Sequence, residues 1–594
     1  MSAYRDPQAG AGMTSDSPPT GPLLTDHLRH WAATRAHQRA FTHVDFPGPT
    51  APGTHRSLSW RALDERVRAV ADGLLRVAAP GERAALVLPQ GLDYVSAFLG
   101  CLYAGVIAVP LFTPELPGHE GRLAGVLRDC EPACLLVTSA GGPTVAAFAA
   151  EHGLPEVAQL PVDELLTPGT GRLPSPAPED IAYLQYTSGS TRTPAGVLIS
   201  HANVLANARQ GIAALNPAAL PVTTVGWLPL FHDMGLLLSV AAPVTGGFPS
   251  VLMDPVAFLE EPARWLRLLG GCPGAISAAP NFAYDYCVAR TDEDTVDELR
   301  LERVRALLNG SEPVRGTTLE RFAAHFAPAG LAPEALCPAY GLAEATVFVT
   351  SDSPDRAPDT VHCSAAALAE GRVEPGAPGE GRTALLVCGP PAGQEIRVAD
   401  PATGAVLGPG VVGEIQLRGP NIGLGYWKKG QLSADCFGVH APGEGAAEGG
   451  WLRTGDLGAL HEGRLLVTGR LKDLIIVDGR NHYPQDIEET VQSALAVVRR
   501  DRLTAVGVPA ADGAGEELVV IAEHRRGLAP GPAEAREALA LARAAVSARH
   551  GVRLADLVLV APGAVPRTSS GKVARAASRA RLTSGGFAAV EAGR

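Results

Sequence analysis

The chain has 594 residues, of which 46% are hydrophobic and 19% charged, so it is long and apolar enough to bury several cores. This balance argues against a disordered chain. The net charge of −12 argues against a protein that binds nucleic-acid phosphates in general.

The cysteines are nine in number and scattered along the chain. The closest pair, Cys130 and Cys134, has no matching pair elsewhere, so neither a zinc site nor a disulfide framework is indicated. This usage is typical of a reducing compartment, and we expect a cytoplasmic protein.

Two features bear on targeting. Residues 1–22 are rich in Pro, Gly, Ser and Asp, which predicts a disordered lead-in rather than a signal peptide. The uncharged segments 94–114 and 234–253 are long enough to cross a membrane. Glycines and prolines interrupt both, so buried helix–turn–strand units explain them better, and we expect no transmembrane segment.

Helical and strand-like patterns alternate from residue 23 onward. Helical apolar spacing is found in residues 24–34, 59–78, 93–103, 123–128, 262–269, 282–289 and 318–326, and from Leu205. Strand-like runs cover residues 84–88, 106–111, 133–138, 181–184, 222–228, 275–278 and 304–308. The alternation predicts βαβ units on a mostly parallel sheet, and therefore an α/β fold.

The pattern changes after this part. Residues 351–383 are dominated by Pro, Gly, Asp and Ala, with a short helical piece at 365–370, which indicates a functional loop or an insertion. Residues 384–418 alternate strands and glycine turns, which predicts a β-rich subdomain. We therefore expect a large domain over residues 23–471, built of mixed β-sheets flanked by helices, and a small α+β domain over residues 472–594.

Residues 186–196 read YTSGSTRTPAG and follow an apolar strand. Four hydroxyls and one glycine stand together in Thr187, Ser188, Gly189, Ser190 and Thr191. Glycine lets backbone amides turn toward an anion, and hydroxyls add donors. A loop at a strand end with this content is consistent with phosphate binding and, equally, with an ordinary surface turn.

Lysine is scarce, because only four of the 50 basic residues are lysine: Lys428, Lys429, Lys472 and Lys572. Arginine occupies nearly all basic positions of this chain. A remaining lysine therefore either occurs by chance or lies where a compact charge on a flexible stem is required.

Three further motifs are sparse. PAYGLAEAT at 338–346 contains Glu344, WLRTGDL at 451–457 contains Asp456, and PRTSSGK at 566–572 ends in Lys572. Taken singly, each residue has an ordinary alternative role: Glu344 as a helix-terminal acid, Asp456 as a turn residue and Lys572 as a surface cation. A P-loop NTPase is excluded, because its motif requires a glycine where Pro566 stands and Ser or Thr where Val573 stands.

Taken together and in order over residues 23–581, these motifs resemble the adenylate-forming ligase superfamily. Several segments are similar to its fatty acyl-AMP ligases: LQY at 184–186, RTPAG at 192–196, GWLPLFHDMG at 226–235, APNFAY at 279–284, NGSEP at 309–313 and GRNHYPQDIE at 479–488. Residues 351–383 stand where that family carries an insertion associated with weak CoA ligation. The chain departs from the superfamily at Ala195, where a lysine is usual, and Arg192 is the proposed substitute.

The resemblance implies a reaction. The chain would use ATP and Mg²⁺ to convert a fatty acid into an acyl-adenylate with release of pyrophosphate. It would then pass the acyl group to the phosphopantetheine thiol of an acyl carrier protein, or of a carrier domain in a polyketide or peptide synthase. A long-chain fatty acyl-CoA synthetase is the nearest alternative, and a catalytically inactive adenylate-fold scaffold is a distant one.

The resemblance also implies roles for residues. The loop of Thr187 would hold the phosphates, Glu344 would hold Mg²⁺, and Lys572 would bridge the attacking carboxylate and the α-phosphate. The remaining nucleotide contacts would come from Gly310, Ser311, Glu312, Ala339, Tyr340, Gly341, Asp456 and Arg470. Lys472 would be the domain hinge, and His232 is either a gate of the acyl channel or a core histidine. Candidates for the acyl pocket are Trp227, Met234, Gly235 and Phe282.

Residues 543–581 contain eight basic residues and one acid, Asp556. This segment is either a solvated basic helix or a docking face for an acidic carrier, with Arg575 and Arg579 as its test positions.

Overall fold

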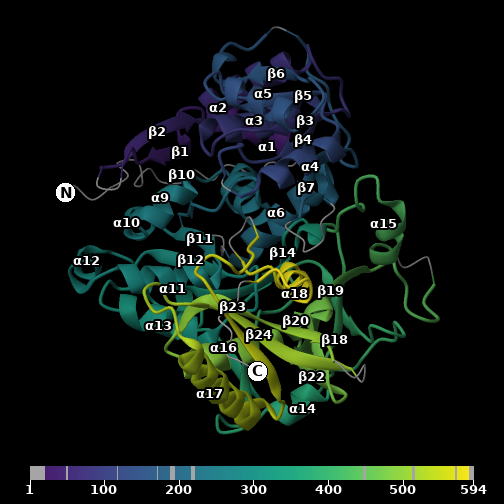
Figure 1. Cartoon of the computed structure of the whole chain (residues 1–594). Coiled ribbons are helices and arrows are strands. Elements are labelled where there is room, and N and C mark those ends of the chain that lie inside the picture. Colours follow the sequence, from purple (N-terminus) through teal and green to yellow (C-terminus); the bar gives the residue numbers. More distant parts are fainter. Residues whose placement is uncertain are drawn as a thin grey trace.

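The computed structural model describes residues 21–48, 51–116, 118–169, 171–187, 194–215, 221–445, 450–510, 515–568 and 572–587. Residues 1–20 of the predicted lead-in lie outside this set, as do Ser188, Gly189, Ser190, Thr191 and Arg192 of the predicted phosphate loop. Figure 1 shows the N-terminal helices and sheet at the top, the teal central part below, and the C-terminal part in front of it.

A six-stranded sheet carries the first part of the alternating pattern. Its order is β6-β5-β3-β4-β7-β8, and all pairs are parallel except β7 with β8. The strands are β3 (Arg83–Leu86), β4 (Ile107–Pro110), β5 (Cys134–Val137), β6 (Ala158–Pro161), β7 (Ile181–Tyr186) and β8 (Gly196–Ser200). Helices of this region are α1 (Leu24–Thr34), α2 (Trp60–Leu74), α3 (Leu92–Ala104), α4 (Glu120–Cys130), α5 (Gly142–Glu151) and α6 (His201–Leu215). The predicted βαβ rhythm is confirmed.

An eight-stranded sheet forms the centre, in the order β14-β13-β12-β11-β9-β10-β1-β2. Its strands are β1 (Arg39–Asp45), β2 (Thr54–Ser59), β9 (Thr223–Gly226), β10 (Ser250–Met253), β11 (Ala275–Ala279), β12 (Val304–Asn309), β13 (Leu336–Gly341) and β14 (Phe348–Ser351). Its helices are α9 (Pro255–Glu260), α10 (Ala263–Gly271), α11 (Asn281–Arg290), α12 (Glu293–Glu298) and α13 (Gly316–Phe326). Strand β1 pairs in parallel with the distant β10, and Figure 1 shows them side by side.

Both segments weighed as membrane spans are buried units of the fold. The first is α3, ended by Gly105 at φ 64°, followed by β4. The second contains α7 (Asp233–Leu236), a π-helical turn (Leu237–Ala241), α8 (Ala242–Gly246) and β10. Within the described ranges, no helix is long and apolar enough to cross a membrane.

Residues 351–383 are folded rather than a bare loop. Strand β15 (Thr360–Ser364) leads into α14 (Ala365–Ala369), as the short helical pattern predicts, and pairs with β16 (Arg382–Leu386). A four-stranded antiparallel sheet follows, made of β17 (Glu395–Ala399), β18 (Gly413–Arg418), β19 (Leu452–His461) and β20 (Arg464–Arg470), with α15 (Gly430–Cys436) between β18 and β19. Val361 and Leu368 share a buried cluster with Leu466 and Tyr483, so the segment packs on the β-rich sheet and the C-terminal part.

The C-terminal part has its own sheet and core. A three-stranded sheet of β23 (Val498–Pro509), β24 (Glu516–His524) and β25 (Leu554–Val560) packs against α16 (Pro484–Ala494) and α17 (Pro532–His550). The hairpin β21 (Ile475–Val477) and β22 (Arg480–His482) precedes it, and α18 (Arg575–Thr583) follows. These elements agree with the predicted α+β character.

Candidate active site

Three residues predicted to bind the nucleotide, Tyr340, Asp456 and Arg470, are in direct contact. The Tyr340 hydroxyl donates to Oδ2 of Asp456 at 2.9 Å, and Nε of Arg470 donates to Oδ1 of the same carboxylate at 2.8 Å. Asp456 and Arg470 are direct partners across β19 and β20, which fixes their spacing. Asp456 is therefore held as an acceptor between a phenol and a guanidinium. Burial raises the pKa of Tyr340 well above its ordinary value, so this residue stays a neutral donor.

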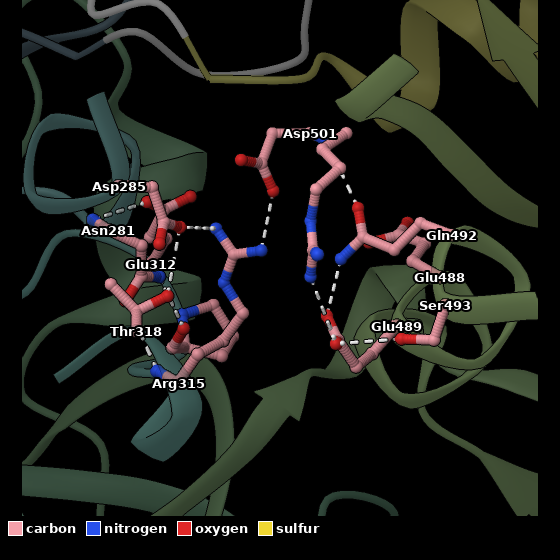
Figure 2. Close-up of polar contacts among 12 residues, drawn as sticks. Asn281, Asp285, Glu312, Arg315, Thr318, Glu488, Glu489, Gln492, Ser493 and Asp501 are labelled. Carbon is pink, nitrogen blue, oxygen red and sulfur yellow. Dashed lines mark hydrogen bonds and ion pairs between the residues drawn. The ribbon is translucent and has the colours of Figure 1, made fainter. Parts of the chain in front are cut away.

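The turn after β12 carries the second group. Ser311 adopts a left-handed φ of 72°, which is uncommon for a residue other than glycine and is found at functional sites. A Cβ on Gly310 would lie 3.0 Å from the Ala339 carbonyl, so the chain passes closely here. The Glu312 carboxylate accepts from the backbone N–H of Asn281 at 2.9 Å, which anchors the turn to α11 (Figure 2).

A large polar cavity of about 610 Å³ joins the central part to the C-terminal part. Among the residues that line it are the predicted Thr187, Phe282, Ser311, Glu312, Arg470, Lys472 and Lys572. Lys572 arrives from the far end of the chain and lies among the charges of Glu312, Asp233 and Asp456. Burial lowers the pKa of Lys572, and these carboxylates offset only part of that effect.

A narrow apolar cavity of about 80 Å³ adjoins it. Its walls include the predicted Met234, Gly310, Ser311, Ala339, Tyr340 and Gly341, together with apolar side chains such as Ile212, Leu238 and Phe348. Ser311 lines both cavities, and its hydroxyl donates to the Met234 sulfur at 3.8 Å. The polar and apolar spaces thus meet at Ser311.

Two acyl-pocket candidates lie elsewhere. Trp227 lines neither cavity, because its ring stacks on Phe258 in the core with centroids 4.0 Å apart. Gly235 has a packing role, since a Cβ there would lie 2.3 Å from the Pro229 carbonyl oxygen. Phe282 lines the polar cavity rather than the apolar one.

His232 precedes α7, and its Nδ1 lies 3.0 Å from Oδ1 of Asp233. It lines neither of these two cavities, and its role as a gate stays a prediction. Burial acts to raise the pKa of Asp233, but the His232 contact, the Met234 N–H and the charge of Lys572 outweigh it and lower that pKa. Asp233 is thus a partly buried anion whose charge acts on Lys572, and the sequence analysis did not predict it as a site residue.

Glu344 lies in a short 3-10 turn (Ala343–Ala345), and its Oε1 accepts from the Tyr426 hydroxyl at 2.8 Å. Burial raises the pKa of Glu344. The turn depends on Gly341, where a Cβ would lie 1.8 Å from the Val347 carbonyl oxygen. No group of three or more His, Cys, Asp or Glu side chains suited to a metal occurs in the part of the chain that the structure describes.

The described ends of the predicted phosphate loop frame the polar cavity. The Thr187 N–H donates to the Ala195 carbonyl at 3.2 Å, which closes the base of the loop between β7 and β8. Nη2 of Arg122, on α4, donates to the Thr187 carbonyl at 3.1 Å. The sequence analysis did not predict Arg122 as a site residue. Helix α4 is far from the loop in the chain, because β5, α5, β6 and β7 stand between them.

The basic segment 543–581 is not one exposed face. It covers the end of α17, then β25, then most of α18. Arg575 pairs with Glu488 at 2.7 Å and with Asp473 at 3.5 Å, and Arg579 pairs with Glu516 at 3.0 Å. Arg575 and Arg579 are thus both engaged in ion pairs within the chain, and the docking face for an acidic carrier stays a prediction.

Known proteins similar to this chain identify its family. Residues 28–427 match the family model described as AMP-binding enzyme. The chain belongs to the AMP-binding enzyme family. It is 43% identical to a Mycobacterium marinum protein named long-chain-fatty-acid–AMP ligase FadD26, over 96% of this chain and 99% of that one. It is 42% identical to the 4-hydroxyphenylalkanoate adenylyltransferase of the same organism, over 95% of this chain and 92% of that one.

Solved structures agree with this membership. One from a study of fatty acyl-adenylate ligases of E. coli and L. pneumophila superposes with a TM-score of 0.83 at 31% identity, covering 95% of this chain and 98% of that chain. A second, the L. pneumophila ligase in complex with acyl adenylate and pyrophosphate, gives a TM-score of 0.72 at 31% identity, covering 95% and 96%. The likeness to these solved structures thus extends beyond residues 28–427 to nearly the whole chain.

Proposed function

We propose that this AMP-binding enzyme is a fatty acyl-AMP ligase, which converts ATP and a fatty acid into an acyl-adenylate and pyrophosphate. The observation that carries the proposal is the junction at Ser311, where an apolar cavity meets the polar cavity that holds Lys572. A fatty acid requires this combination, because its chain is apolar and its carboxylate must reach a phosphate. The names of the similar mycobacterial proteins support the same activity.

The reaction is an in-line displacement at the α-phosphate. An oxygen of the fatty-acid carboxylate bonds to the α-phosphorus, the bond from that phosphorus to the bridging oxygen breaks, and its electron pair leaves with pyrophosphate. Catalysis then depends on positioning and on neutralising charge. We assign the ribose to Asp456 and Arg470, and the adenine to the turn of Gly310 and the end of β13.

Lys572 is the residue that we assign to the reacting atoms. Two negatively charged groups, the carboxylate and the α-phosphate, must approach each other, and one ammonium between them lowers that repulsion. Asp233 and Glu312 lie close enough to influence its pKa, so the ammonium has counter-charges before substrate binds. Burial disfavours the charged form, which favours pairing with incoming anions.

Mg²⁺ fits Glu344. This carboxylate has a pKa raised by burial, so its charged form gains from a cation. Mg²⁺ in nucleotide sites uses one or two carboxylates together with phosphate oxygens and water, and needs no three-residue cage. When bound, the ion would neutralise phosphate charge, and Glu344 would hold it with its orientation set by Tyr426.

We assign the second step, acyl transfer to the phosphopantetheine thiol of a carrier protein or carrier domain, to a turn of the C-terminal part about Lys472. This residue lies in the short helix Leu471–Asp473 that links β20 to β21. Domain closure and reopening of this kind are common where one site performs two steps. The turn would withdraw Lys572 and open the cavity to the thiol.

The test is the fate of the acyl group. The full chain is given ATP, Mg²⁺ and a panel of fatty acids, and the products are identified by mass. We expect acyl-adenylate alone, and acylated carrier protein after addition of a holo-carrier. Accumulation of acyl-CoA after addition of CoA, at a rate equal to that of acyl-adenylate formation, would make the protein an acyl-CoA synthetase instead.

A further inference from the structure

One strand of the central sheet brings a hydroxyl to the wall of the apolar cavity. Thr224 lies on β9, and it lines this cavity together with apolar residues such as Ile276 of β11 and Leu308 of β12. Among the described residues that line the cavity, three side chains carry a hydroxyl: Thr224, Ser311 and Tyr340. The hydroxyls of Ser311 and Tyr340 each donate to an acceptor within the chain.

The Thr224 hydroxyl has no such partner. Its oxygen is buried and makes no hydrogen bond within the part of the chain that the structure describes, and the residue is 1% exposed. A buried hydroxyl without a partner is unfavourable, because it has given up its hydrogen bonds to water. Valine has a similar shape and also favours a strand, but it carries no polar group. The hydroxyl of Thr224 is therefore a donor and acceptor that a ligand of this cavity can use.

The backbone holds Thr224 in a fixed place. It pairs with Ser250 of β10 on one side and with Ile276 of β11 on the other, and its N–H donates to the Pro249 carbonyl at 3.0 Å. Rotation about χ1 moves the hydroxyl and the methyl group between staggered positions, so the hydroxyl can turn to a ligand while the backbone stays in place. A group on a rigid strand selects its partner by position.

The register of the sheet gives the depth of Thr224 in the cavity. Its partner Ile276 stands three residues before Ala279, which ends β11 and pairs with Asn309 of β12. At about 3.3 Å per residue, Thr224 lies about 10 Å back along the sheet from this edge. The apolar and polar cavities meet at Ser311, two residues beyond Asn309. Thr224 therefore lies beside the interior of a bound acyl chain rather than beside its carboxylate.

We propose that Thr224 selects a fatty acid that carries a hydroxyl group in the interior of its chain. The proposal rests on the proposed adenylation and names the class of acid that the cavity favours. A hydroxyl on the acid pairs with the Thr224 hydroxyl, since each of the two groups both donates and accepts. With an unsubstituted chain the Thr224 hydroxyl stays unpaired, so the cavity discriminates against that acid.

The decisive variant is Thr224→Val, which removes the hydroxyl and nearly keeps the shape of the side chain. Thr224→Ser keeps the hydroxyl. The matched control is Thr223→Val, the same change at the adjacent residue of β9, which lines neither of the two cavities. Successive side chains of a strand point to opposite faces of the sheet, so this control changes the strand without changing the cavity.

The full chain is given saturating ATP and Mg²⁺ with fatty acids of one length, either unsubstituted or with one hydroxyl at successive carbons. The kcat/KM of pyrophosphate release is measured for each acid. We expect an acid hydroxylated at an interior carbon to be preferred over the unsubstituted acid by about tenfold, the scale of one buried hydrogen bond. Thr224→Val should lose this preference by gaining rate with the unsubstituted acid and losing rate with the hydroxylated one. Thr224→Ser and Thr223→Val should keep the preference.

Three results would overturn the proposal. The first is an unmodified chain that prefers no hydroxylated acid, and the second is an unchanged preference in Thr224→Val. The third is an equal loss of preference in Thr223→Val, which would indicate that the strand rather than the hydroxyl is responsible.

A binding measurement separates this proposal from the proposed function. Each acid, kept below the concentration at which it forms micelles, is titrated calorimetrically into the full chain without ATP. If acids bind but none is adenylated, the proposed function fails, while their affinities for the unmodified chain and Thr224→Val still decide the role of Thr224. If unsubstituted and hydroxylated acids are adenylated and bound equally well, only the role of Thr224 fails. If no acid binds, both proposals fail.

Discussion

Nη1 of Arg315 lies 2.5 Å from Oδ1 of Asp501, and this ion pair joins the central part of the molecule to β23 of the C-terminal part (Figure 2). Arg315 precedes α13, and Asp285 on α11 lies 3.6 Å from its other nitrogen. Burial acts to lower the pKa of Arg315, but the charges of Asp501, Glu312 and Asp285 outweigh it and raise that pKa. Arg315 therefore stays charged, and the ion pair holds the arrangement in which Lys572 enters the cavity.

The first prediction concerns this pair. Asp501→Asn removes the charge, and asparagine tolerates the left-handed φ of 57° that Asp501 adopts in a bulge of β23. A partly buried ion pair contributes about 1 kcal/mol, so the C-terminal part should spend less time in this position and adenylation should slow about fivefold. Pyrophosphate release at saturating ATP measures this rate.

The control is Arg321→Gln. Arg321 pairs with Asp285 at 2.6 Å, wholly within the central part. We expect that variant to keep the full rate. An equal slowing of both variants would show that the loss comes from general destabilisation of α11 and α13 rather than from the contact with the C-terminal part.

The second prediction uses the scarcity of lysine. Because the chain has only four lysines, carbon-13 methyl labelling of lysine side chains gives few NMR signals to resolve. One of them should titrate below the usual lysine pKa of 10.5, since burial lowers the pKa of Lys572, and it should be missing in Lys572→Arg. The charged form is lost as pH rises through that lowered pKa, so adenylation should fall at a lower pH than an ordinary lysine would allow. Four signals titrating together at 10.5 would contradict the burial of Lys572.

The third prediction tests the apolar cavity as the acyl site. Gly211 on α6 lines this cavity, and a Cβ there would lie 4.0 Å from Cγ of Phe348, which is ordinary contact. Gly211→Ala should fold and act normally, whereas Gly211→Leu should fill the space. Leucine favours a helix over glycine by about 1 kcal/mol, so the helix itself should not suffer.

For Gly211→Leu we expect the KM for a long-chain acid to rise about tenfold or more, the loss that about two buried methylene contacts would give, with little change for a short-chain acid. Steady-state adenylation with the two acids measures both values. An equal rise for both acids, or no rise for either, would place the acyl chain elsewhere.

Much of the fold follows from apolar spacing. The helices α2, α3, α10 and α13 and the strands β3, β4 and β12 lie where their patterns predict, because each is long or apolar enough to show its period. The hairpin of β1 and β2 could not be predicted from such a pattern, since β2 reads THRSLS and is mostly exposed. Its place is set by pairing with β1 at the edge of the sheet, which no local pattern records.

The site was predictable where a residue type is rare or a turn is special. Lys572 is noticeable because it is one of four lysines. Tyr340 and Asp456 are noticeable because each stands next to a glycine in a turn motif. Arg122 and Arg315 are two of 46 arginines, the 50 basic residues less the four lysines, so composition cannot rank them. Their roles come from the tertiary contacts of α4 and of β23.

Trp227 shows the opposite case. It lies in the motif GWLPLFHDMG, which marked it for the acyl pocket, yet its ring stacks on Phe258 in the core and meets Phe282 edge-on. A large aromatic side chain at the end of a buried strand gains more from core packing than from a ligand wall. Met234, seven residues later, lines the apolar cavity because α7 turns it inward beside Ser311.

The most direct test of the account is fatty-acid-dependent pyrophosphate release by the full chain, compared with Lys572→Ala, with the acyl product identified by mass. We predict release that requires both ATP and a fatty acid, yields acyl-adenylate, and falls at least about a hundredfold in the variant while ATP affinity stays nearly constant, since Lys572 acts on the reacting atoms. Near-normal release by Lys572→Ala, or no release by the unmodified chain with any fatty acid, would contradict it.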